Sequence, residues 1–117
     1  MFAVFKKIIA HTMLLAGLIG PALAQEGITD NCFNFLNAQD YTRAEFEAKQ
    51  LLQRGSLDRV EERLTQMCLG QAYSNIGRTQ DALPALQRVE ALSQTTQELA
   101  LAYNWLGLTY AKLNDLD

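Results

Sequence analysis

The stretch LGQAYSNIGRTQDALPALQRVEAL, residues 69–92, decides the fold of this chain. It reads as the second half of one helix, a tight turn at Gly77 and a second helix. Apolar and small residues recur at helical spacing on both sides of the turn, which predicts two antiparallel packed helices. Gly70 lies inside the first helix, where glycine costs about 1 kcal/mol relative to alanine. Its presence there predicts the close approach of a neighbouring helix.

The same periodicity continues on both sides of this stretch. The predicted helices cover residues 31–37, 41–54, 57–76, a segment ending near 92, and 97–113. The sequence has no alternating β-branched run and no Asn-Gly or Asp-Gly hairpin turn. The predicted fold class is therefore all-α.

Polar residues at the helix starts supply the expected N-caps. They are Asp30, Asp40, Ser56, either Thr79 or Asp81, and Thr95 with Glu98 in a capping box. Glycines at 55 and 77 suit the left-handed position that ends a helix. Pro84 is expected in the first turn of its helix, where the missing N–H has no intrahelical partner.

The first 24 residues are typical of a secretory signal peptide. Two lysines precede an apolar run over residues 8–19, and Ala22-Leu23-Ala24 forms an A-x-A cleavage motif. An uncleaved membrane anchor is the alternative, but the apolar run is about a dozen residues and a spanning helix needs roughly 20. We expect cleavage after Ala24, a polar leader over residues 25–30, and a periplasmic or secreted protein without stable membrane insertion.

The composition of the cleaved chain limits its chemistry. It keeps 8 basic and 13 acidic residues, a net charge of −5, which argues against nucleic acid and anionic membranes as partners. It has no histidine, no Gly-rich phosphate loop and no serine beside a plausible base in the sequence. Glu61 and Glu62 are adjacent and point apart on a helix, so they read as surface charge. We expect no enzyme, no metal site and no cofactor.

Two cysteines, Cys32 and Cys68, remain after cleavage. An exported protein meets an oxidising compartment, so a single disulfide between them is allowed. Two buried free thiols that pack as small hydrophobes are the alternative. The spacing of the two residues does not support a CxxC redox centre or a zinc site.

The spacing Leu-Gly-x-x-Tyr, with alanine nine residues after the tyrosine, resembles the tetratricopeptide repeat (TPR), a helix–turn–helix unit. The resemblance covers about residues 30–117, and part of the signature occurs twice. The signature residues are Leu69, Gly70, Tyr73, Ala82, Leu106, Gly107 and Tyr110.

This resemblance implies an α-solenoid of antiparallel helix hairpins, with about two and a half repeats over residues 31–117. The units would span about 31–54, 57–92 and an incomplete 96–117. In this register Cys32 and Cys68 fall on the first helices of neighbouring units, which lie side by side, and this placement favours the disulfide.

A TPR array usually binds peptide in a concave groove lined by its first helices. Carried over, the candidate groove residues are Met67, Gln71, Ser74, Asn75, Asn104, Leu108 and Lys112. Leu64 and Leu101 lie beside them in this register, and Phe33, Leu36 and Asn37 are weaker candidates. Plain core packing is the alternative for Met67 and Leu108.

The type of ligand also follows from the resemblance. The carboxylate clamp of chaperone-binding TPRs needs several Lys, Arg and Asn residues in the groove, and Met67 and Gln71 depart from that pattern. A C-terminal carboxylate is therefore not the expected ligand. The mixed groove fits an extended or helical segment held by backbone hydrogen bonds and apolar anchors.

The resemblance implies a non-catalytic exported scaffold that binds another protein or peptide in the cell envelope. Two other hypotheses remain. The third unit ends where its second helix should begin, so the chain is expected to be a fragment of a longer TPR-containing protein or enzyme. Alternatively, a second copy covers the open last helix, and the chain is a self-associating structural module, a homodimer.

Overall fold

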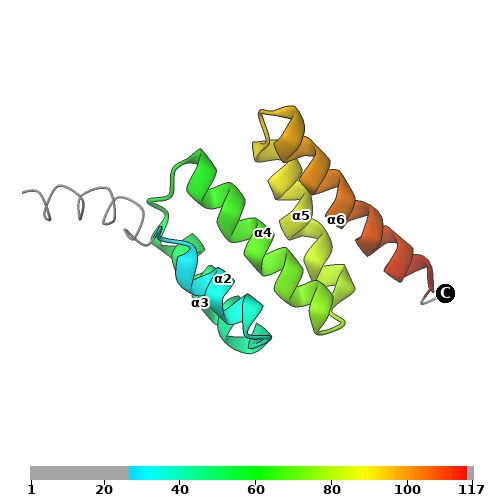
Figure 1. Ribbon diagram of the computed structural model, residues 1–117, viewed down its shortest axis with the longest axis horizontal. Helices are drawn as coiled ribbons and strands as arrows, with labels where there is room; N and C mark the ends of the chain where they lie inside the picture. The colour runs from blue at the N-terminus through cyan, green and yellow to red at the C-terminus, as the bar shows by residue number, and fades with distance from the viewer. Residues whose placement is uncertain (1–26, 116–117) are drawn as a thin grey trace, which may run out of the picture.

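The computed structural model of the chain describes residues 27–115, which form five α-helices joined by short turns (Figure 1). The helices are α2 (Asp30–Asn37), α3 (Tyr41–Arg54), α4 (Arg59–Asn75), α5 (Thr79–Leu92) and α6 (Thr96–Asp115). The predicted all-α class is confirmed for these residues, among which no β-strand occurs. The predicted signal peptide lies outside the described residues.

Helix α4 lies at the centre of the arrangement. The helix pairs α2–α3 and α4–α5 each pack together, and α6 lies against α5 and along part of α4 (Figure 1). Fully buried alanines on four helices let the backbones approach closely: Ala44, Ala48, Ala72, Ala82 and Ala102. Leu86 and Val89 of α5 are also fully buried and belong to the same hydrophobic core.

The predicted close approach at Gly70 is confirmed. A Cβ atom added at Gly70 would lie 2.6 Å from Cδ2 of Leu86 and 2.8 Å from its Cγ. Leu86 is fully buried and has no room to move aside. At Gly107, the matching position on α6, an added Cβ would meet nothing within 4 Å among the described residues.

The turns combine expected and unexpected residues. Gly55 and Gly77 have φ angles of 68° and 82°, so both hold the predicted left-handed conformation. The turn between α2 and α3 uses Gln39, whose φ is 61°. The left-handed residue lets the Asp40 N–H donate to the carbonyl of Phe35 at 2.8 Å, which ends α2.

Two predicted caps are confirmed. The Asp40 carboxylate accepts a hydrogen bond from the Arg43 N–H at the start of α3. At the start of α6, the Glu98 N–H donates to the Thr95 hydroxyl, and the Thr95 N–H donates to the Glu98 carboxylate, which together form the expected capping box.

Three helix starts were predicted wrongly. Helix α4 begins at Arg59 and not at residue 57, because Asp58 and Glu61 form a reciprocal capping box that replaces Ser56. Asp30 is the first residue of α2 and not its cap, since its carboxylate turns back to accept from the Gly27 N–H.

Helix α5 begins at Thr79, with Arg78 as N-cap and no side-chain cap. The Arg78 carbonyl accepts from the N–H groups of both Asp81 and Ala82 and so starts the helix early. Pro84 is therefore the sixth residue of α5 and not part of its first turn. Its ring leaves the Gln80 carbonyl without the usual intrahelical partner.

Helix α6 buries a different stripe from the one its apolar residues suggest. Tyr103 and Tyr110 follow the periodicity of Leu106 but are exposed, whereas Ala102 and Thr109 are fully buried beside Leu106. Small residues on this stripe let α6 approach α5 closely, and the tyrosines are displaced to the outer surface.

Alanine substitutions at the two glycines should have opposite effects. Gly70→Ala should lower the free energy of unfolding by about 1 kcal/mol, because overpacking against Leu86 outweighs the gain in helix propensity. Gly107→Ala should raise it by up to about 1 kcal/mol, since its Cβ meets open space. Urea denaturation of residues 25–117, followed by circular dichroism, measures both values, and changes of the same sign would contradict the packing described here.

Candidate peptide-binding trough

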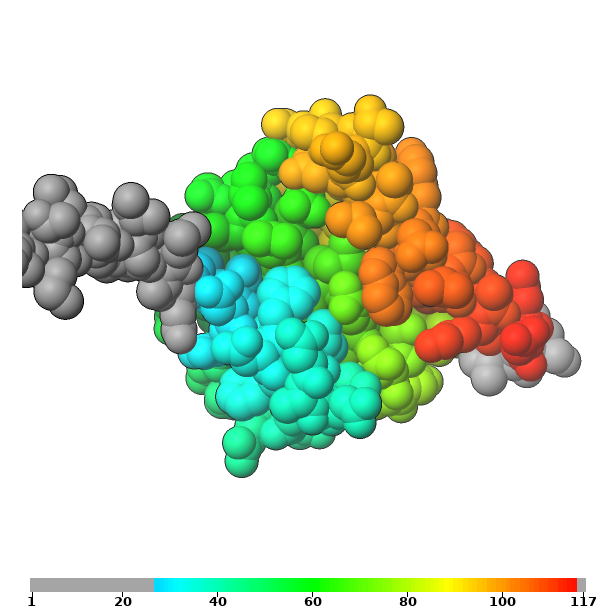
Figure 2. Space-filling view, viewed as in Figure 1, coloured from blue at the N-terminus to red at the C-terminus, as the bar shows by residue number. Residues whose placement is uncertain are grey.

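A shallow trough runs over α4 between α2 and α6 (Figure 2). The surface of α4, drawn in green, forms its floor between the cyan atoms of α2 and the orange atoms of α6. Leu64, Gln71 and Asn75 lie on one face of α4 at helical spacing and are half-buried or exposed. The trough is defined here as these three residues with Leu101, Asn104 and Leu108 of α6.

The structure removes two of the predicted groove residues from the accessible floor. Met67 belongs to the core and is almost fully buried, so the core alternative is correct for this residue. Ser74 is buried where α4 meets α6. Helical geometry explains both outcomes, because these two positions are rotated toward α6, whereas Gln71 points between α2 and α6.

The remaining predicted residues bring apolar and amide side chains to one surface. Leu101 is 52% exposed and Leu108 is 48% exposed, one above the other along α6. Asn104 is exposed between them, and Gln71 is half-buried on the floor. The Asn75 side chain donates to the Gln71 carbonyl at 2.8 Å, so its amide oxygen stays available as an acceptor.

Lys112 holds α6 against the end of α4. Its ammonium donates to the Ser74 hydroxyl at 3.0 Å and to the Ser74 carbonyl at 3.2 Å. Ser74 lies in the last turn of α4, so this contact places Lys112 at the C-terminal end of that helix, where the helix dipole favours a cation.

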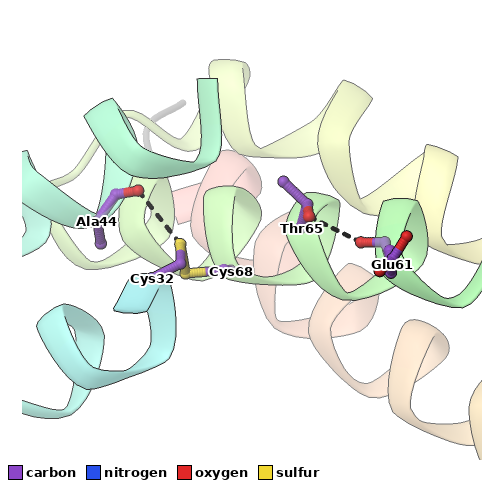
Figure 3. The surroundings of a disulfide bond; sticks show 5 residues. All are labelled: Cys32, Ala44, Glu61, Thr65 and Cys68. Carbon is purple, nitrogen blue, oxygen red and sulfur yellow. Dashed lines mark hydrogen bonds between the residues drawn. A yellow bond between two sulfur atoms is a disulfide. The ribbon is translucent and has the colours of Figure 1, made fainter. Parts of the chain in front are cut away.

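A disulfide between Cys32 and Cys68 fixes the α2 side of the trough to its floor (Figure 3). The two sulfur atoms are 2.04 Å apart, and both cysteines are fully buried. The bond links residues 36 positions apart, and a loop of that length corresponds to about 4 kcal/mol of stabilisation in the chain-entropy model. Of the weaker groove candidates beside it, Leu36 is buried, Phe33 is half-buried and Asn37 is exposed.

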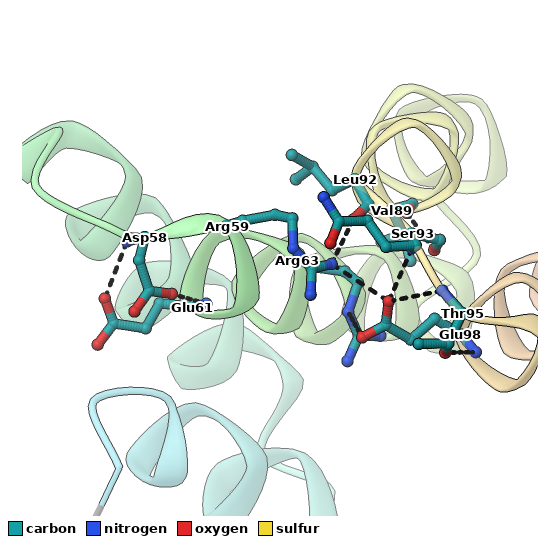
Figure 4. A network of polar contacts seen from close by, with 10 residues as sticks. Asp58, Arg59, Glu61, Arg63, Val89, Leu92, Ser93, Thr95 and Glu98 are labelled. Carbon is teal, nitrogen blue, oxygen red and sulfur yellow. Dashed lines mark hydrogen bonds and ion pairs between the residues drawn. The ribbon is translucent and has the colours of Figure 1, made fainter.

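Glu98 joins the start of α6 to α4 (Figure 4). One of its oxygens accepts from the Gln94 N–H at 2.8 Å and from Nη1 of Arg59 at 3.2 Å, and the other lies 3.2 Å from Nε of Arg63. The Arg63 contact is an ion pair without hydrogen-bond alignment, which accounts for the unsatisfied buried Nε. The Gln94 hydrogen bond, followed by the two arginines, lowers the pKa of Glu98.

Glu45 makes a matching cluster with the signature tyrosine. It accepts from Lys49 at 2.7 Å, from Arg78 at 3.2 Å and from the Tyr73 hydroxyl at 3.4 Å. The Arg78 guanidinium also lies 4.5 Å from the centre of the Tyr73 ring. The hydrogen bond from Lys49, together with the charge of Arg78, lowers the pKa of Glu45.

The repeat-signature residues do not share one environment. Leu69, Gly70, Tyr73, Ala82 and Leu106 are buried, whereas Gly107 and Tyr110 are exposed.

Glu61 and Glu62, expected as plain surface charge, have structural roles: Glu61 completes the α4 capping box and Glu62 pairs with Arg88 at 2.7 Å. The same three-residue spacing predicted the capping box of Thr95 and Glu98, and it could have predicted the one formed by Asp58 and Glu61.

The described residues were compared with the requirements of a metal site, a pocket and a membrane span. Over residues 27–115, no cluster of His, Cys, Asp and Glu side chains could hold a metal ion. One hollow over the same residues is lined by Leu52, Gly55, Leu57 and Glu62, none of which belongs to the trough. Membrane-spanning length and apolarity are likewise missing from every helix of the described part.

Comparison with protein-family models, curated proteins and solved structures finds no match to this chain.

Acid should weaken the fold through Glu45 and Glu98. Both folded-state pKa values lie below the ordinary value of 4.5, so their stabilisation is present above that pH and is lost as pH falls through the lowered values. The variant Glu98→Gln should show a lower melting temperature at pH 7 and a smaller drop between pH 6 and pH 3.

Thermal unfolding across this pH range, monitored by circular dichroism, tests the role of Glu98. Glu47→Gln is the matched control, because Glu47 makes no ion pair among the described residues. Equal acid sensitivity in the wild type and in Glu98→Gln would contradict the role assigned to this carboxylate.

Proposed function

We propose that this chain is an exported, non-catalytic scaffold of the TPR type, which binds a segment of another protein in the trough over α4. The observation that carries the proposal is the pairing of two exposed leucines, Leu101 and Leu108, with the amides of Gln71 and Asn104 on one surface. Helix packing supports the repeat assignment, since α2–α3 and α4–α5 form successive pairs joined by short turns.

The chemistry of the trough selects an uncharged, extended segment with aliphatic side chains. Leucines spaced seven residues apart on α6 provide two apolar anchors, and carboxamides both donate to and accept from a peptide backbone. The one lysine at this surface, Lys112, is already bonded to Ser74. A ligand carboxylate would have to compete for that ammonium, which disfavours C-terminal and acidic ligands.

Export is part of the proposal. Residues 1–24 carry the basic, apolar and A-x-A parts of a signal peptide. A fully buried disulfide supports the same conclusion, because such bonds persist in oxidising compartments and are rare in the cytosol. The cell envelope is therefore the proposed place of action, with a protein or peptide of that compartment as the partner.

Charge placed in the trough should abolish partner binding. The double variant Gln71→Glu/Asn104→Glu puts two carboxylates beside the leucine anchors and should lose capture of the wild-type partner from periplasmic extract. Each substituted side chain is at least partly exposed, so the fold should be retained. Quantitative mass spectrometry of the captured proteins measures the loss.

The matched control is Gln53→Glu/Gln87→Glu, which adds the same charge at exposed positions on α3 and α5. It should capture the partner as the wild type does. Equal capture by both double variants would show that the trough is not the binding surface.

Expression of the full precursor in a Gram-negative host should give a periplasmic product that begins at Gln25. The A-x-A motif that ends at Ala24 places the cut there. Intact-mass measurement of the periplasmic fraction gives the N-terminus, and alkylation without reductant should leave both cysteines unlabelled. A cytosolic, uncleaved product would overturn the export assignment.

A further inference from the structure

A second surface lies on the outer side of α6, away from the trough. Tyr103, Gly107 and Tyr110 are spaced four and three residues apart and share one face of the helix. Tyr103 is 55% exposed and Tyr110 is 47% exposed, and the space above Gly107 is open among the described residues. The leucine anchors of the trough lie on the other flank of the same helix.

The chain itself shows what covers a face of this kind. On α4, the sequence Leu69-Gly70-x-x-Tyr73 meets α5: Leu86 lies above Gly70, and the Ala82 carbonyl is 3.7 Å from the position of an added Cβ. On α6 the same pattern recurs as Leu106-Gly107-x-x-Tyr110. Leu106 is buried as Leu69 is, so the two helices sit alike on their inner side. Only the outer side of α6 lacks the covering helix among residues 27–115.

The chemistry of the outer face fits an apolar helix. No charged side chain lies between Glu98 and Lys112 on α6. Glycine is disfavoured in a helix interior, and an open Gly107 gains nothing from its missing side chain unless another backbone comes close. The two tyrosines flank that position and provide large contact surfaces.

We propose that the Tyr103–Gly107–Tyr110 face of α6 is a docking site for an amphipathic helix of a partner protein, one that presents alanine and, four residues later, leucine, as α5 does with Ala82 and Leu86. This surface is separate from the trough and does not depend on the proposed function. The leucine enters the space above Gly107, and the alanine lets the two backbones approach.

A second copy of the chain does not supply this chemistry. The Ala82 and Leu86 side of α5 is already buried against its own α4. A copy could offer its own α6, which would bring four tyrosines around two glycines and leave no branched side chain for the space above them. The complementary partner is therefore a helix of the α5 type.

A synthetic peptide with the sequence of residues 78–93, blocked at both ends, is the probe. Titrated into the ¹⁵N-labelled chain of residues 25–117, it should shift the amide resonances of Gly107 and of its neighbours on α6. Gly107→Leu should weaken binding at least tenfold by filling the space, and it should leave the fold intact because that space is open. A peptide with glutamate in place of the leucine equivalent to Leu86 should not bind.

The variant Leu108→Ser, on the trough flank of α6, should bind the peptide as the wild type does, so failure here is distinguishable from failure of the trough. Shifts centred on Gly70, or binding unaffected by Gly107→Leu, would mean that the peptide exchanges with the resident α5 and would overturn the proposal. Sedimentation equilibrium that shows a dimer dissociated by Tyr103→Glu would also overturn it, in favour of a second copy.

Discussion

The burial of α4 on nearly every side is the constraint on which the rest of the structure depends. Four positions within two turns each secure a different helix: Cys68 is bonded to α2, Gly70 admits α5, Tyr73 reaches Glu45 of α3, and Ser74 accepts from Lys112 of α6. Each contact needs its own residue type. A thiol, a missing side chain, a phenol and a small hydroxyl are not interchangeable, so this segment tolerates little change.

Most of the ion pairs among the described residues connect two different helices. An exposed pair contributes little alone, because salt and side-chain entropy reduce its value. Glu98 is different, since it accepts from two backbone or capping groups and contacts two arginines of α4 (Figure 4). With Lys112 bonded to Ser74 at the far end, α6 is attached to α4 at both ends. These two attachments set the distance between α4 and α6, and so the width of the trough.

The sequence predicted the positions of the helices well, but it predicted less well which side chains of each helix are buried. Helical period, the left-handed glycines at 55 and 77 and the cap at Asp40 are local features, which the chain determines within a few residues. The start of α5 at Thr79 and the inward rotation of Met67 depend on where neighbouring helices lie, and no local signal encodes that. The same reason explains Tyr103 and Tyr110, which follow the apolar period of α6 but remain outside the packed side.

Gly70 and Gly107 show this limit most clearly, because one sequence pattern occupies two environments. The pattern specifies a helix with a flat, uncharged face and a place for close approach, but the covering element is supplied elsewhere. On α4 that element is α5, and on α6 the described residues provide none. The leucine flank and the tyrosine flank of α6 are different arcs of one helix, so a helix docked over Gly107 leaves Leu101 and Leu108 uncovered. The two proposed sites are therefore compatible in space: a segment bound in the trough would not block a helix docked on the outer face of α6.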